Sequence, residues 1–232
     1  MRWPVLVLLF ALAGCVSTTS GPSGSRSAAA RPASVPTDGD VARFRTVVSR
    51  VEPVAERICR REATGVNCDF RIVVDERADQ PANAFQSLDK NGRPVLAFTL
   101  AMIADVRNED ELAFVMSHEA AHHIAGHIPR QQQNAMTGAI ALGGLASLMG
   151  ASSGAIEAAV DLGASVGART YSKDFELEAD AIGTVIAKES GFNPVVGAGF
   201  FTQLPDPGNT FLGTHPPNAQ RIETVRRVEA SL

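Results

Sequence analysis

The sequence predicts an α+β domain, mainly helical, over residues 40–232. Three observations support this class. Apolar residues recur at helical spacing through most of the region. Only three short segments resemble strands, so the sheet must be small. No repeat or linker divides the region, and a chain that is 45% hydrophobic can build one substantial core.

The first part of this region predicts one helix and a small sheet. Residues 40–62 carry apolar side chains at helical spacing, and Pro53 is expected to kink or split that helix. Three strand-like segments follow at 70–74, 84–88 and 94–99, with Asp89-Lys90-Asn91-Gly92 as a hairpin turn between the last two. The sheet should therefore be antiparallel in part.

The next predicted helix contains a cluster of histidines. Asn108 can cap its start, and Glu111 stands three residues later, as in a capping box. The helix then runs through histidines 118, 122, 123 and 127 and should weaken near Gly126 and Pro129.

Residues 135–170 are rich in Ala and Gly and nearly free of charge. We interpret them as two small-residue helices packed as a hairpin. A membrane-touching or substrate-lining element is the alternative. Further helices are expected at 172–190, from Asn193-Pro194, and from Pro216 or Pro217 to Val228, with a loop at 205–208.

Residues 1–14 are typical of an export signal, with Arg2 followed by a nine-residue apolar run. The end of this segment, Leu12-Ala13-Gly14-Cys15, resembles a bacterial lipobox, which predicts cleavage before a lipidated Cys15. The alternative is a secretory signal with a free cysteine. Because Val16 replaces the Asp of inner-membrane retention, we expect the periplasmic face of the outer membrane. Residues 15–39, rich in Ser, Gly, Ala, Thr and Pro, should form a flexible tether.

Two cysteines remain, Cys59 and Cys68. In an oxidising compartment they are expected to form a disulfide, which stabilises by roughly 2–3 kcal/mol in the chain-entropy model. Two reduced, buried thiols are the alternative. The formal net charge of -4 argues against a nucleic-acid binder with a broad basic surface. No apolar run reaches the ~18–20 residues of a spanning helix, which argues against a polytopic membrane protein.

The motif His118-Glu-Ala-Ala-His122 carries the chemistry. Positions i and i+4 share one face of a helix, so both imidazoles can reach one metal ion. Glu119 can then act as base on a water that the metal activates, as in zinc peptidases.

Two other histidines are further candidates for metal ligands. On a continuous helix His127 lies about 140° round from His122, so it cannot join the same ion without unwinding. His123 and His127 form a rival i, i+4 pair, but Ile124 follows His123 where an acid would be needed. We interpret that pair as structural or solvated.

A catalytic zinc needs a third protein ligand. Glu176 and Asp180 share a helix face, whereas Glu178 points about 200° away from Glu176. Glu176 can therefore ligate the metal while Asp180 orients an imidazole. An exposed acidic helix is the alternative reading of this segment.

With Thr214-His215-Pro216-Pro217 and Arg221-Ile222 added, these motifs resemble the M48 zinc metallopeptidases. The similarity covers residues 40–232 and is nearest to short outer-membrane lipoproteins of the periplasmic quality-control branch. It implies a zincin-like fold and one Zn²⁺ held by His118, His122 and Glu176, with Glu119 as base and Asp180 behind the ligands.

The same resemblance implies roles for residues outside these motifs. His215 and Arg221 match an active-site His and Arg of the family. His215 either steadies the oxyanion or occupies the open position of the zinc. Asn83-Ala84-Phe85 resembles the strand beside the cleft, where an extended substrate pairs its backbone.

We therefore expect a lipid-anchored periplasmic zinc endopeptidase that degrades misfolded or unassembled envelope proteins. Its partners are polypeptides and, through the anchor, the membrane, but not nucleic acid. The alternative is a zinc-bearing chaperone or assembly factor whose site His215 holds closed. The oligomeric state and the cleavage preference stay open.

Overall fold

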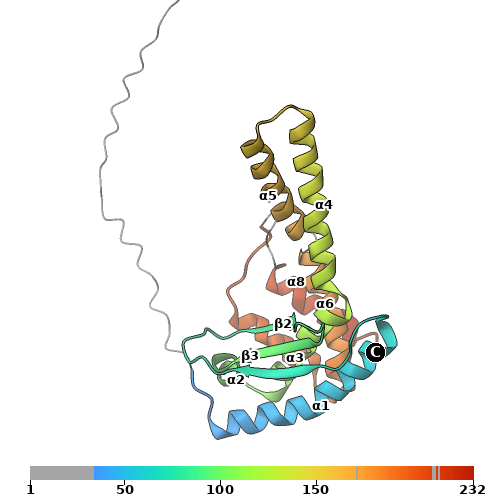
Figure 1. Cartoon of the computed structure of the whole chain (residues 1–232). Helices are drawn as coiled ribbons and strands as arrows, with labels where there is room; N and C mark the ends of the chain where they lie inside the picture. Colours follow the sequence, from blue (N-terminus) through green and yellow to red (C-terminus); the bar gives the residue numbers. More distant parts are fainter. Residues whose placement is uncertain (1–33, 171, 211–212, 214) are drawn as a thin grey trace, which may run out of the picture. The chain divides into compact units, whose positions relative to one another are not determined.

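A computed structural model describes residues 34–170, 172–210, 213 and 215–232 of the chain. The predicted signal peptide, Cys15 and most of the predicted tether therefore lie outside the described residues. All described residues belong to one compact unit, in which helices surround a three-stranded sheet (Figure 1). This arrangement confirms the predicted class, α+β and mainly helical.

Helix α1 (Asp38–Glu62) begins at a capping box in which the Thr37 and Asp40 side chains each bond the other's backbone. Pro53 was expected to kink or split this helix; it does not split it, because α1 continues through it. Pro53 is exposed, whereas the apolar face of the helix is buried on both sides of it. Packing of that face against α3 compensates for the backbone hydrogen bond that proline cannot make.

The sheet holds β1 (Arg71–Asp75), β2 (Ala84–Leu88) and β3 (Pro94–Thr99) in the order β1-β3-β2. β2 pairs with β3 antiparallel across the predicted turn, where Gly92 has φ 76°, and β1 pairs with β3 parallel. The sheet is thus partly antiparallel, as expected, and β2 forms one of its edges. A short helix, α2 (Leu100–Asp105), follows β3 directly and was not predicted.

Helix α3 (Glu109–Ile124) is buried along nearly its whole length and packs against α1, α6 and the sheet. The Asn108 side chain accepts from the Glu111 backbone N–H at 2.9 Å, which is the predicted cap. The Glu111 carboxylate bonds the Arg107 backbone N–H at 2.8 Å, one residue before the cap position of a capping box. The helix ends at Ile124, the chain turns at Gly126 with a φ of 64°, and α4 begins at once with His127.

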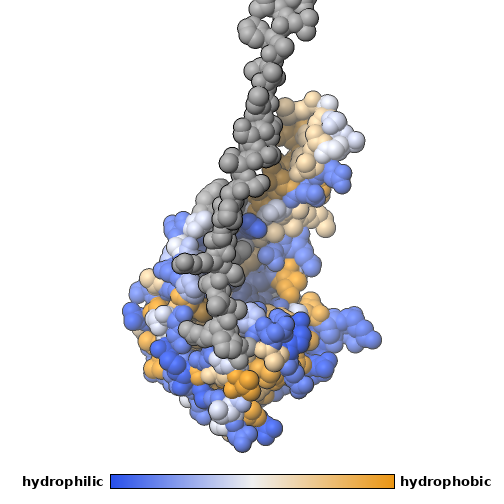
Figure 2. Space-filling model, turned by 90° about the vertical axis from the view of Figure 1, so that its left-hand side faces the viewer, coloured by the Kyte–Doolittle hydropathy of each residue, from blue (hydrophilic) through white to orange (hydrophobic). Residues whose placement is uncertain are grey.

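Helices α4 (His127–Leu148) and α5 (Ser153–Thr170) form the expected hairpin, which extends away from the sheet in Figure 1. Glycines make the close approach possible, because a Cβ on Gly163 would lie 2.1 Å from the Gly138 carbonyl oxygen. Figure 2 shows a mostly pale-orange surface on this hairpin, where Ile140 and Leu148 are exposed. Within the described residues, no helix combines the length and the hydropathy that crossing a bilayer requires.

The hairpin geometry predicts opposite effects for two glycine substitutions. Gly163→Ala should lower the unfolding free energy by about 1–3 kcal/mol, because its methyl group meets backbone of the facing helix. Gly144→Ala, where a Cβ meets nothing within 4 Å, should raise stability by up to ~1 kcal/mol through helix propensity. Thermal unfolding of both variants checks this, and equal shifts in one direction would contradict the packing.

The remaining helices complete the core and bring residues from the C-terminal part of the chain against α3. They are α6 (Ser172–Glu189), α7 (Pro194–Gly197), a 3-10 turn (Ala198–Gln203) and α8 (Asn218–Glu229). A Cβ on Gly183 would lie 3.1 Å from the His118 backbone, so glycine lets α6 pack closely on α3 at the first histidine of the motif. A disulfide joins Cys59 at the end of α1 to Cys68 before β1, with the Cα atoms 5.7 Å apart.

Candidate metal centre

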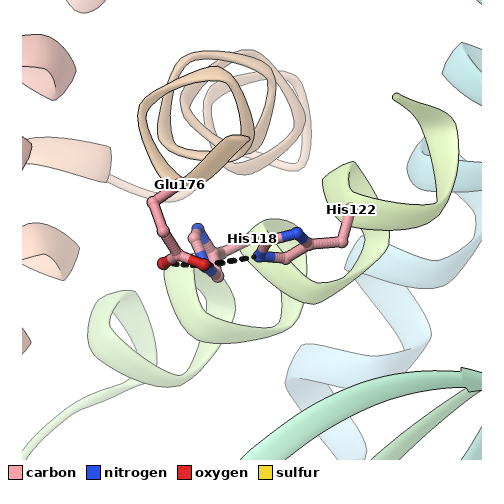
Figure 3. Close-up of side chains that lie close together, drawn as sticks. All are labelled: His118, His122 and Glu176. Atoms are coloured by element: carbon pink, nitrogen blue, oxygen red, sulfur yellow. Dashed lines mark hydrogen bonds and ion pairs between the residues drawn. The ribbon is translucent and has the colours of Figure 1, made fainter. Parts of the chain in front are cut away.

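Three side chains from two helices converge beside the sheet (Figure 3). His118 and His122 come from α3, one turn apart, and their Nε2 atoms are 3.0 Å from each other. Glu176 reaches them from α6, with Oε2 3.5 Å from His118 Nε2 and Oε1 3.5 Å from His122 Nε2. The three ligand atoms lie within 4.8 Å of one another, so these residues are placed to bind a metal ion.

The donor set fits zinc. Tetrahedral Zn²⁺ binds imidazole nitrogen and carboxylate oxygen at about 2.0–2.2 Å, which puts neighbouring ligand atoms roughly 3.3–3.5 Å apart. The two histidine nitrogens are 3.0 Å apart, and a different Glu176 oxygen lies 3.5 Å from each, so the separations are near that spacing. Three protein ligands also leave a fourth position for water or substrate, as a catalytic site requires.

A buried ion pair stands behind His118. Asp180 is fully buried, and its Oδ1 lies 3.0 Å from His118 Nδ1. Arg221 donates to the same carboxylate from Nε at 2.8 Å and from Nη2 at 2.7 Å. Its guanidinium also packs on the Phe201 ring, 3.8 Å from the centroid. Asp180 therefore contacts the outer nitrogen of a ligand, and Arg221 compensates the buried charge of Asp180.

The electrostatics of the three candidate ligands differ. Burial and the Arg221 charge oppose protonation of His118, but Asp180 and Glu176 outweigh them and raise its pKa to about 9. Burial, and then the charge on His118, lower the pKa of His122 to about 2. Burial disfavours ionised Glu176, but the hydrogen bond from His118 and the neighbouring cations hold its pKa below its usual range. Glu176 is thus the anionic ligand.

Glu119 follows the first histidine and lines the same cavity as the three ligands. Burial raises the pKa of its carboxyl to about 7, with His118 opposing the shift. A base whose pKa lies near neutral pH can both accept a proton and return it, which is what peptide hydrolysis requires.

The cavity, about 400 Å³ in volume, gathers the remaining candidate residues. Ala84 and Phe85 of the edge strand β2, and Asn83 just before it, line the cavity together with His215 and Arg221. The His215 side chain is 54% exposed, and its Nε2 lies 3.8 Å from a Glu176 oxygen. The cavity therefore contains every residue that the sequence suggested for direct contact with metal or substrate.

His123 and His127, which helical spacing pairs in the sequence, bond different partners. His123 is buried and turned away from the site, with Nε2 2.7 Å from the Asn67 carbonyl oxygen. His127 contacts His122 instead, with 2.8 Å between the two Nδ1 atoms. On a continuous helix His127 would point away from His122, but the turn at Gly126 separates α3 from α4 and brings the His127 ring to the site. Sequence reasoning missed this contact, although the expected weakening at Gly126 was a signal for it.

Two histidines one turn apart, a glutamate beside the first and a carboxylate from a later helix define a metallopeptidase site. The model of peptidase family M48 matches residues 42–229, which is most of the chain. The chain therefore belongs to peptidase family M48.

The chain is also similar to the beta-barrel assembly-enhancing protease of Escherichia coli. Identity is 32% over 148 residues for the protein of strain O157:H7 and 31% over 148 residues for that of strain K12. Each alignment covers 58% of this chain and 30% of the relative, so the chain spans less than a third of these relatives.

Proposed function

We propose that this chain is a lipid-anchored zinc endopeptidase of the periplasm that degrades misfolded or unassembled envelope proteins. The observation that carries the proposal is the convergence of His118, His122 and Glu176 beside Glu119 in one cavity. A structural zinc has no use for an adjacent base or an open position, whereas a hydrolase needs both.

The chain's own residues supply the steps of hydrolysis. His118, His122 and Glu176 would hold a zinc ion, which would lower the pKa of a water and polarise a carbonyl. Glu119 takes the proton of the attacking water and delivers it to the leaving amine. His215, at the cavity wall, donates a hydrogen bond to the oxyanion that develops on the carbonyl oxygen.

The edge strand suggests how a substrate is held. β2 pairs with β3 on one side only, so its other side can pair with an extended polypeptide. Asn83, Ala84 and Phe85 line the cavity at this strand, next to Glu119. Backbone pairing selects unfolded segments rather than a particular sequence, which suits a substrate class defined by misfolding.

The cellular role rests on two further supports. The relatives are named for enhancing β-barrel assembly, which suggests envelope substrates. Cys15 and the residues before it resemble a lipobox, which suggests an anchor at the periplasmic face of the outer membrane.

Cleavage of an unfolded protein tests the proposal. The zinc-loaded chain should cut casein and leave a stably folded protein intact, and a chelator should stop the reaction. His215→Ala should lower kcat/KM by roughly 10²-fold, as loss of one oxyanion donor does. Faster cleavage by His215→Ala would instead mean that His215 closes the site. If neither the wild type nor His215→Ala cuts casein, the protease proposal fails.

A zinc-bearing chaperone is the second candidate. Its specific support is the position of His215, whose Nε2 lies 3.8 Å from the ligand Glu176. A chaperone would reduce casein aggregation without cutting it, and Glu119→Gln would leave that effect intact.

A further inference from the structure

His122 has a dedicated partner on its outer side. Its Nε2 faces His118 and Glu176, so this nitrogen is the one offered to the metal. Its other nitrogen, Nδ1, lies 2.8 Å from Nδ1 of His127, the first residue of α4. His127 is only 5% exposed. It therefore stands behind His122 as Asp180 stands behind His118.

The hydrogen bonds beyond His127 determine which atoms carry protons. A neutral imidazole that offers Nε2 to a metal keeps its proton on Nδ1. His122 therefore donates from Nδ1 to the bare Nδ1 of His127, whose own proton must sit on Nε2. That Nε2 lies 3.1 Å from Glu178 Oε2, so His127 donates in turn to a carboxylate.

Two contacts hold this series of hydrogen bonds in place. Arg130 donates to the same Glu178 oxygen at 2.7 Å, which orients the carboxylate. The His127 ring stacks on Phe175, 4.6 Å between centroids and 10° between planes, and Phe175 adjoins the ligand Glu176.

We propose that His127, held by Glu178 and Arg130, is a positioning residue for His122. It keeps the metal-binding tautomer of His122 and the orientation of its ring through the hydrogen bond between the two Nδ1 atoms. The proposal rests on the proposed zinc site but not on proteolysis. Partners of this kind are worth roughly 10–100-fold in metal affinity.

Zinc affinity of the purified full chain, measured by competition with a chelating dye, tests the proposal. His127→Phe keeps a planar ring on Phe175 but removes the acceptor, and it should weaken zinc binding roughly 10–100-fold. His127→Asn can place an oxygen where Nδ1 was and should bind within about threefold of wild type. The matched control is His123→Phe, which replaces a buried histidine of α3 that bonds the Asn67 carbonyl oxygen and should leave the affinity unchanged.

Thermal unfolding in chelator separates positioning from packing. A merely structural role would lower the melting temperature of metal-free His127→Phe and leave its zinc affinity equal to that of wild type, which would overturn the proposal. If His127→Phe does not fold, Glu178→Ala takes its place, since Glu178 is 42% exposed. It should weaken zinc binding several-fold, and unchanged affinity overturns the proposal.

The results that would overturn the proposed function differ from those that would overturn the role of His127. Tight zinc binding without casein cleavage would overturn the peptidase proposal and leave the role of His127 standing. Equal zinc affinities for wild type and His127→Phe, with casein cleaved, would overturn the role of His127 and leave the peptidase proposal standing. A wild type that binds no zinc would overturn both.

Discussion

Glu119→Gln should lower kcat/KM for casein by about 10²–10⁴-fold while zinc stays bound in a 1:1 ratio. Glutamine has nearly the same shape but cannot accept the proton of the attacking water. The carboxyl lines the cavity and does not belong to the group of metal-binding side chains. Its pKa, raised by burial to about 7, suits a base that works at neutral pH.

A matched substitution on the same helix controls for the loss of a carboxylate. Glu109 is exposed in the first turn of α3, so Glu109→Gln should keep full activity. Hydrolysis rates and zinc content, measured side by side for both variants, check the prediction. If Glu119→Gln keeps more than a tenth of the activity, or loses its zinc, then Glu119 is not the base.

Arg221→Met should lower the unfolding free energy of the metal-free protein by about 3–5 kcal/mol. Asp180 is fully buried, and Arg221 donates two hydrogen bonds to it at 2.7 and 2.8 Å. Without the Arg221 guanidinium, the Asp180 carboxylate is a buried charge that has lost its main positive partner. Urea denaturation in the presence of chelator measures the loss.

Two further variants make this result specific. Arg226→Met removes an exposed arginine from the same helix and should change stability by less than ~0.5 kcal/mol. Adding Asp180→Asn to Arg221→Met should recover part of the loss, because the buried charge is then removed as well. A loss below ~1 kcal/mol for Arg221→Met would show that the pair contributes little to folding.

Local rules predicted the elements that need few distant contacts. The strands at 84–88 and 94–99 and the turn between them were correct, because alternation and turn residues act within one hairpin. The Asn108 cap was correct for the same reason. Pro53 does not split α1, because burial of the apolar face, a long-range effect, outweighs a local breaker. α2 was not predicted, because it has only six residues directly after a strand. So short an apolar run does not show the spacing that distinguishes a helix from a strand.

The sequence by itself determined which residue types could bind a metal. The spacing of His118 and His122 is sufficient, because an α-helix brings positions i and i+4 together wherever it lies. Only the tertiary structure decided how those ligands are supported. Gly183 lets α6 approach α3, so that Glu176 and Asp180 reach the histidines. The turn at Gly126, between α3 and α4, places the His127 ring in contact with His122. Such contacts depend on how whole helices pack, and no spacing along the chain encodes that.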